Sequence, residues 1–351
     1  MRATWLDARS EPWWRRLLLL PLVPVSWVYA AVAGLHRGAS ERGWLRRRRL
    51  AGHVVSVGNL VVGGTAKTPV SAWLARGLSR RGRKVALASR GYGRSGREAV
   101  SVVSDGRFVR GRAEESGDEP MVLAAQAAGV PVLVGRDRGV VGLRALAAFG
   151  AEVLVLDDGF QHHRLARDVD LVLFDGALGF GNGYALPRGP LREPASALRR
   201  ADAVLVIDGP LPPEDEDRLR SLAPTARRFD ARRRPSGLRP LAGGEAAPAD
   251  ALSGLVVGLL AGLARPASFR RSVEALGATV VAERFFPDHH RYRPRDLAGL
   301  ADVTPMWITT EKDAVKLVPQ WTGRADVRVL TLAVEVEEPE RMLDWIESRL
   351  R

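Results

Sequence analysis

The sequence has no cysteine, and this absence excludes disulfides, thiol nucleophiles and cysteine metal sites. Only four of its 53 basic residues are lysines, so arginine supplies nearly all of the positive charge. With 40 acidic residues the formal net charge is +13. A GC-rich coding bias explains such an excess of arginine, so the charge alone does not indicate a partner. In such a chain each lysine is worth inspecting.

The composition also lacks the extremes of disordered, collagen-like and multi-span membrane proteins, since 46% of the residues are apolar and 26% are charged. The length of 351 residues suits two α/β domains. After residue 50, β-branched runs of strand length alternate with helical segments, which predicts parallel sheets covered on both faces. About ten strands are many for one open sheet, so we expect two sheets.

One uncharged run, residues 17–35, is near the minimum length for a membrane span. Pro21 and Pro24 interrupt its helical pattern, and positive charge flanks both ends, so no charge asymmetry orients a span. No signal-peptide cleavage site is evident. We expect a membrane-associated helix in the lipid surface, with arginines 46–49 meeting anionic headgroups. A single span and a buried core helix remain the alternatives.

A strand, a glycine-rich turn, Lys67-Thr68 and a helix follow one another, the order that a phosphate loop needs. Lys67 would neutralise phosphate charge, and the Thr68 hydroxyl would hold Mg²⁺. Alanine at position 66 replaces the usual glycine and would cost about 1–2 kcal/mol if its φ is positive. An ordinary glycine-rich turn is the alternative. The predicted nucleotide-binding residues are Val61, Val62, Gly63, Gly64, Thr65, Ala66, Lys67 and Thr68.

Four apolar residues, 153–156, run into Asp157 and Asp158, the pattern of a Walker-B strand whose carboxylate holds Mg²⁺. Its place about ninety residues after a phosphate loop, in a parallel-sheet protein, strengthens that interpretation. The two segments together predict that the protein binds ATP and Mg²⁺.

The predicted fold is α/β: a P-loop NTPase-like parallel-sheet domain, a second α/β domain and an N-terminal membrane-associated helix. We expect the helix with its basic flank over residues 1–50 and the P-loop core over residues 51–167. The second domain is expected over residues 168–336, closing over the cleft, with a surface excursion at 227–248. A C-terminal helix is expected over residues 337–351.

Motifs along most of the chain resemble the tetraacyldisaccharide 4′-kinase (lipid A 4′-kinase) family. They occur in the family's order: residues 56–60 and 63–69, 89–93, 117–120, 157–162, 181–183, 186–193, 286–289 and 310–316. The resemblance implies a kinase that moves the γ-phosphoryl group of ATP to the 4′-hydroxyl of a tetraacylated glucosamine disaccharide 1-phosphate. It also implies a peripheral or monotopic location on the cytoplasmic face of the inner membrane.

Asp118 follows a glycine and begins a helix, so from the residues alone it is either a helix cap or an exposed functional acid. The resemblance favours the base beside the acceptor hydroxyl and implies that His289 orients Asp118 across the cleft. Lys67 completes the predicted catalytic set. The metal set is Thr68, Asp157, Asp158 and Glu119, where Glu119 serves a second metal or caps the same helix.

Gln161 and His162 are expected around the Walker-B acids. Asn182, Arg188 and Arg192 lie in a Gly/Pro-rich loop where arginine pairs with the acceptor's 1-phosphate or is merely solvated. Two adjacent histidine pairs have no third ligand for zinc.

A membrane-bound P-loop ATPase, acting as a switch without a small acceptor, is the alternative to the kinase. It would retain the phosphate loop, Asp157 and the basic N-terminus, but it does not explain Asp118 or His289. The expected partners are the lipid A precursor and the membrane surface, with no nucleic acid and no obligate protein partner.

Overall fold

The computed structural model describes residues 11–44, 46–92, 94–96, 98–263 and 266–350. Residues 1–10 of the predicted N-terminal segment and Gly93 of the predicted family motif lie outside the described residues.

The strands of this part of the chain form one sheet of twelve, in the order β10-β9-β11-β12-β8-β7-β6-β1-β5-β2-β4-β3. Neighbouring strands are parallel except that β3 is antiparallel to β4 and β8 to β12. The strands are β1 (His53–Asn59), β2 (Val85–Ser89), β3 (Ser101–Asp105), β4 (Pro131–Val134), β5 (Val153–Asp157), β6 (Val169–Asp175), β7 (Ala203–Ile207), β8 (Arg227–Pro240), β9 (Val256–Gly262), β10 (Thr279–Phe286), β11 (Met306–Thr310) and β12 (Asp326–Val336).

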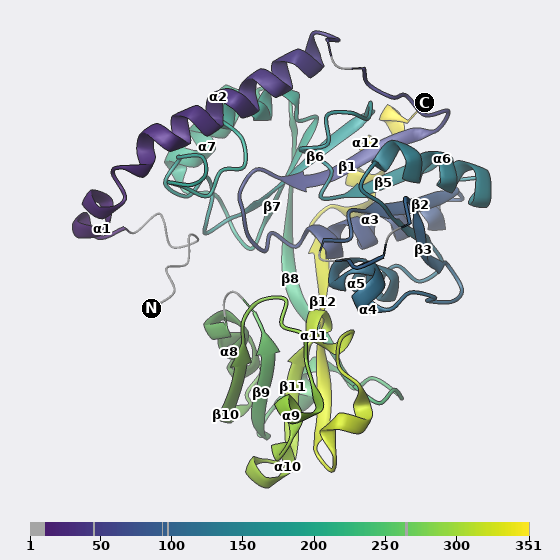
Figure 1. The fold of residues 1–351 in the computed structure, drawn as a ribbon, viewed down its shortest axis with the longest axis vertical. Helices are drawn as coiled ribbons and strands as arrows, with labels where there is room; N and C mark the ends of the chain where they lie inside the picture. The colour runs from purple at the N-terminus through teal and green to yellow at the C-terminus, as the bar shows by residue number, and fades with distance from the viewer. Residues whose placement is uncertain (1–10, 45, 93, 97, 264–265, 351) are drawn as a thin grey trace.

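The sheet has two lobes, joined by the two long strands β8 and β12 (Figure 1). The first lobe contains β1 to β7 and residues 227–231 of β8, which pair with β7. The second lobe contains β9 to β11 and the rest of β8, which pairs with β12. The prediction of two separate sheets is therefore wrong, because the antiparallel β8–β12 pair continues the hydrogen-bonded ladder from one lobe to the other.

The expected boundary between residues 167 and 168 is also corrected. Strand β6 pairs with β1, and β7 pairs with β6, so both belong to the first lobe. The chain leaves that lobe only within β8. Sequence spacing did not reveal this because β6 and β7 are apolar and parallel, like the strands on either side of the boundary.

Helices cover the sheet because their apolar residues recur on one face. Buried residues of α3 pack in one core with the parallel strands of the first lobe, and α12 returns from the second lobe to that same core. The helices are α3 (Lys67–Arg80), α4 (Ala113–Ser116), α5 (Asp118–Gln126), α6 (Arg138–Phe149), α7 (Pro213–Leu222), α8 (Pro266–Glu274), α9 (Pro294–Leu297), α10 (Leu300–Val303), α11 (Glu311–Ala314) and α12 (Pro339–Arg349), with 3₁₀ turns η2 (Ala195–Arg200), η3 (Ala249–Leu252) and η4 (Pro319–Thr322).

The arginine-rich stretch that was expected as a surface excursion is strand β8. Phe229 and Ala231 point into the first core, while Asp230 between them and the arginines on either side of them are more exposed. Pro235 is tolerated because the register of β8 against β12 shifts beside it. The alternation of buried and exposed side chains is typical of a strand, but the many charged residues concealed this pattern in the sequence.

The N-terminal segment forms two helices, α1 (Trp13–Leu18) and α2 (Leu22–Glu41), with the chain breaking at Pro21. Figure 1 shows α2 lying across the first lobe, on the side away from the second lobe. Within the described residues, none of the helices has the length and apolar character needed to cross a membrane.

Candidate active site

The phosphate loop, residues 60–66, connects β1 to α3 at the carboxyl edge of the sheet. Gly63 and Ala66 have φ of 134° and 53°, and Ala66 is the residue immediately before α3. The side-chain amide of Asn59 donates to Thr65 Oγ1 at 2.7 Å, and its oxygen accepts from Lys67 Nζ at 3.2 Å. The last residue of β1 therefore fixes both the loop and its lysine.

Val61 and Val62 do not fit the predicted nucleotide contacts. Val61 is buried and bridges to Leu191, and the Val62 N–H donates to the Pro190 carbonyl at 2.8 Å. The loop of residues 181–193 therefore lies beside the end of β1, held by hydrogen bonds to the backbone of Val61 and Val62. The part of the predicted phosphate loop that is not paired with residues 190–191 begins at Gly63.

The Walker-B acids lie directly opposite the start of α3, because β5 is the neighbour of β1. Asp157 is buried and accepts from Ser71 Oγ at 3.0 Å and Thr68 Oγ1 at 3.3 Å. Burial, followed by repulsion from Glu119 and Asp158, raises the pKa of Asp157 to about 7. These oxygens are the donor type that Mg²⁺ prefers.

Asp158 has a different environment from Asp157, although the two are adjacent. Its carboxylate accepts from Arg192 at 2.9 Å through both oxygens and lies 3.6 Å from Lys67 Nζ. Burial opposes ionisation, but Lys67 and Arg192 outweigh it and hold the pKa of Asp158 below its ordinary value. The pKa of Asp157 is therefore raised and that of Asp158 is lowered.

Asp118 pairs with residues from the other lobe. Its carboxylate lies 3.2 Å from His289 Nδ1 and 3.4 Å from Lys316 Nζ, and α11, which precedes Lys316, packs against α5. Burial opposes ionisation of Asp118, yet His289 and Lys316 hold its pKa below the ordinary value. Gly117, not Asp118, is the N-cap of α5, and its helix has no side-chain cap bond, so the capping interpretation is wrong.

His289 is itself held in an unusual conformation, with φ of 59°. Its Nε2 lies 3.3 Å from Lys312 Nζ, which also binds Asp288 at 2.6 Å. Helix α5, which begins at Asp118, packs against α3, which begins at Lys67, and this contact links the acid–histidine pair to the phosphate loop and the Walker-B edge. Because α5 has no side-chain cap bond, the capping alternative for Glu119 is wrong, and its metal role stays a prediction. The phosphate loop, paired acids and Asp118–His289 pair form one continuous candidate site.

Comparisons with known proteins agree with this geometry. The family model "Tetraacyldisaccharide-1-P 4′-kinase" matches residues 18–351. The chain belongs to this family.

Two curated proteins named tetraacyldisaccharide 4′-kinase illustrate the similarity. The one from Anaeromyxobacter dehalogenans strain 2CP-C is 43% identical over 341 residues, covering 93% of this chain and 90% of that protein. The one from Dechloromonas aromatica is 42% identical, covering 100% and 97%. The crystal structure of LpxK from Aquifex aeolicus in complex with ATP has a TM-score of 0.77 and 31% identity, covering 95% of this chain and 100% of that one.

Within this family member, Arg188 is not available to a ligand. It is 6% exposed and forms a bidentate pair with Glu11 at 2.7 and 3.0 Å, while its N–H donates to Ser26. The predicted contact with an acceptor phosphate is therefore wrong for Arg188, because its charge is already neutralised inside the protein. Asn182 binds the carbonyl of Arg188 and the N–H of Tyr184, so it shapes the loop.

The structure brings Gln161 and Arg192 together and places His162 in a different environment. Gln161 donates to the Asn59 carbonyl at 3.0 Å and approaches Arg192 at 3.5 Å, so it lies beside the Asp158 pair. His162 instead experiences burial and the charge of Arg138, which lower its pKa to about 4. Its ring is neutral at pH 7.

Sequence reasoning missed four residues that support the site. Ser71 is one turn into α3 and binds Asp157, and Asn59 ends β1. Arg138 is buried near both Walker-B acids, whose charges act on its pKa. Lys316 lies 3.4 Å from the Asp118 carboxylate, and the scarcity of lysine in this sequence, which drew attention to Lys67, could have indicated it. Among the described residues, no group of three or more histidine or acidic side chains is arranged to hold a metal.

Proposed function

We propose that this protein transfers the γ-phosphoryl group of ATP to the 4′-hydroxyl of a tetraacylated glucosamine disaccharide 1-phosphate at a membrane surface. Family membership supports the ATP-dependent 4′-kinase reaction. The observation that carries the assignment of roles is the Asp118–His289 pair, since a switch ATPase without a small acceptor has no need for a base held between lobes.

ATP is proposed to lie with its phosphates against the N-terminus of α3. The N–H groups of Gly64 and Ala66 and the Lys67 ammonium would neutralise the phosphate oxygens, whereas the Thr65 N–H donates to the Gly63 carbonyl at 3.1 Å. Thr68 Oγ1 and the buried Asp157 would hold Mg²⁺, which supplies positive charge to the β- and γ-phosphates when bound. Mg²⁺ usually takes one or two carboxylates plus substrate phosphates, so this oxygen pair is sufficient.

Asp118 is proposed as the base. The 4′-oxygen forms a bond to the γ-phosphorus as the bond from that phosphorus to the oxygen of ADP breaks, and the hydroxyl proton passes to the Asp118 carboxylate. His289 orients the carboxylate through its Nδ1 contact. Arg192 keeps Asp158 ionised beside Lys67, so the charge around the phosphates is set before the acceptor arrives.

The membrane surface is proposed to meet α1 and α2. The residues of α2 that face the body of the protein are small or polar: Ser26 and Ser40 are buried, and Ala30 packs against the core. The outward face is apolar, an arrangement opposite to that of a soluble surface helix. The large exposed apolar residues of this segment are Trp13, Trp14, Leu17, Leu18, Leu20, Val25, Trp27, Val28, Tyr29, Val32, Leu35 and Trp44.

Binding of α1 and α2 to the membrane would bring the candidate active site next to its lipid acceptor. Arginines next to the apolar face would bind anionic headgroups, which favours the cytoplasmic side of an inner membrane. The helix also contacts the site loop, since Tyr29 donates to the Arg192 carbonyl at 2.9 Å.

Mass spectrometry of a tetraacyl disaccharide 1-phosphate incubated with ATP and Mg²⁺ tests the reaction. We expect one added phosphate with the wild-type protein. Asp118→Asn should lower kcat by about 10²–10⁴-fold, while ATP binding is retained. Asp302→Asn, at an exposed acid in the first turn of α10, is the matched control. Rapid ATP hydrolysis that does not need the lipid would instead identify a switch ATPase.

A further inference from the structure

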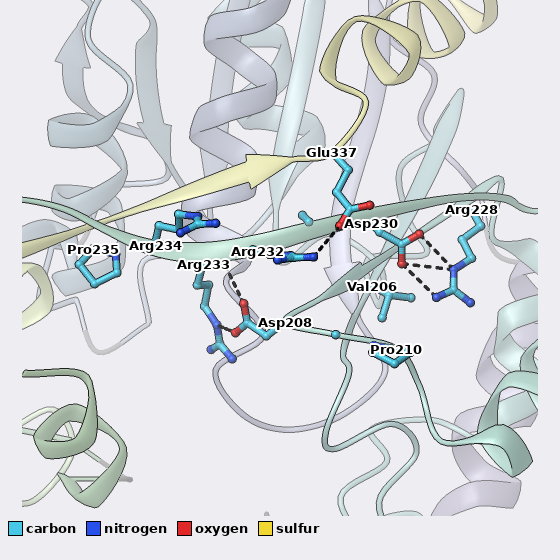
Figure 2. A pocket seen from close by; sticks show the side chains of 12 residues that line it. Val206, Asp208, Pro210, Arg228, Asp230, Arg232, Arg233, Arg234, Pro235 and Glu337 are labelled. Atoms are coloured by element: carbon cyan, nitrogen blue, oxygen red, sulfur yellow. Dashed lines mark hydrogen bonds and ion pairs between the residues drawn. The ribbon is translucent and has the colours of Figure 1, made fainter. Parts of the chain in front are cut away.

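Strand β8 passes from one lobe to the other beside the phosphate loop. Ala231 pairs with Ile207 of β7 and also with Val336 of β12, so it marks the crossing point. Arg233 is the second residue beyond it. Figure 2 shows Arg232, Arg233 and Arg234 in succession on this strand, with the side chain of Arg233 turned towards Asp208.

The Arg233 side chain joins three segments of the first lobe. Its guanidinium donates to the Gly64 carbonyl at 3.1 Å and to Asp175 Oδ2 at 2.8 Å, and its Nε binds Asp208. Its backbone N–H also donates to Asp208, at 2.6 Å. These partners are the phosphate loop, the end of β6 and the residue after β7.

The neighbouring arginines do not make such contacts. Arg232 pairs with Glu337 and Arg234 with Glu335, and both side chains are more than half exposed. Figure 2 shows the hollow at this strand, where Arg228 also pairs with Asp230. Each of the arginines that line this hollow is paired with an acid.

We propose that Arg233 is a positioning residue that ties the phosphate loop to the strand connecting the lobes; this rests on the proposed role of that loop in binding ATP. Holding the Gly64 carbonyl fixes the peptide plane between Gly64 and Thr65, and hence the geometry of the loop that meets phosphate. The Asp118–His289 contact also spans the lobes, so the predicted phosphate loop and the proposed base are each held by a side chain from the other lobe.

An arginine is required for this arrangement by geometry. A planar guanidinium reaches three separate acceptors with fixed N–H groups, whereas a lysine ammonium is a point charge on a flexible stem. Arg233→Lys should therefore preserve the charge but not the contact with Gly64.

Arg233→Ala and Arg233→Lys, with Arg234→Ala as the control one residue away, test the proposal in the full-length protein. We expect both Arg233 variants to raise the Kd and KM for ATP by at least about tenfold, the effect of losing a charge-assisted hydrogen bond. The KM for the lipid and the melting temperature of Arg233→Lys should stay close to wild type. Arg234→Ala should bind ATP normally.

Wild-type ATP affinity in folded Arg233→Lys would overturn the proposal, as would an equal loss in Arg234→Ala. Lys67→Ala separates this result from failure of the proposed function. If Lys67→Ala binds ATP normally, the loop is not the nucleotide site. If ATP binding is lost in Lys67→Ala but retained in both Arg233 variants, the loop binds ATP and only the role of Arg233 is wrong.

Discussion

At the residue scale, two adjacent carboxylates illustrate how environment sets chemistry. Asp157 is buried with hydroxyl partners and a repelling Glu119, whereas Asp158 is met by Lys67 and Arg192. The same residue type therefore has a raised pKa at one position and a lowered pKa at the next. This contrast suits one acid for metal binding and the other for a permanent charge pair.

The raised pKa of Asp157 predicts a pH effect on stability. Its folded pKa is about 7 and its ordinary value is 3.8, so between these values the folded state binds more protons than the unfolded state. This group's contribution to the free energy of unfolding therefore falls as pH rises from about 4 to 7. Without Mg²⁺, wild type should lose stability relative to Asp157→Asn over this window. Denaturant titrations at several pH values measure the difference; parallel profiles would contradict it.

Ala66 is a second residue whose local environment affects stability, here through backbone strain. Its φ of 53° lies in the left-handed region, where a Cβ costs about 1–2 kcal/mol. Ala66→Gly removes this strain but adds about 0.4–1 kcal/mol of unfolded-state entropy. We expect a free energy of unfolding equal to or up to about 1.6 kcal/mol above wild type. Ala147→Gly, on the exposed side of α6, should be destabilised by about 1 kcal/mol. Equal losses in the two variants would show that position 66 is not strained.

At the element scale, short apolar runs determined most strands. β-branched runs predict strands over residues 131–134, 203–207 and 306–310, and a helical apolar period predicts a helix over residues 138–149. The bounds of β4, β7, β11 and α6 agree with these ranges because the patterns end abruptly there. Strand β3 was missed, and β8 was taken for a surface excursion. In β8 the pairing of two lobes, rather than local hydrophobicity, stabilises an arginine-rich strand.

Helix α2 is the element whose role is most directly testable. Trp27 is 65% exposed on its outward face. Trp27→Glu should weaken binding to vesicles containing anionic lipid by about tenfold or more, since burial of such a side chain contributes about 1.5–3 kcal/mol. Leu143→Glu, at a half-exposed leucine of α6, is the control and should bind normally. Cosedimentation measures both, and undiminished binding of Trp27→Glu would place the membrane contact elsewhere.

At the scale of the whole molecule, the C-terminal helix α12 packs into the core of the first lobe. Strand β12 leads out of the second lobe into α12, whose Met342, Leu343 and Ile346 complete the first core. Arg81 adds ion pairs to Glu340, Asp344 and Glu347 along that helix. The first lobe is therefore incomplete without the last residues of the chain.

Ile346→Ala tests this closure. Ile346 is fully buried, so its truncation should lower the free energy of unfolding by about 2–5 kcal/mol. Activity per folded molecule should be retained, since the helix lies away from Asp118. Ser348→Ala on the exposed side of α12 is the control. Denaturant unfolding with circular dichroism measures both; equal stability of the two variants would show that α12 is not part of the core.

The amino-acid sequence by itself determined the α/β class, the phosphate loop and the Walker-B strand, because each depends on short spacings and local periodicity. The family was indicated by the resemblance of motifs along most of the chain. Only the tertiary structure decided that one sheet spans both lobes and that Lys316 joins the Asp118–His289 pair, which the family resemblance had implied. It also decided that Arg188 forms an ion pair with Glu11, whereas Arg192 forms one with Asp158. Two arginines four residues apart look alike in sequence. Their roles differ because burial and charge partners come from segments far away along the chain.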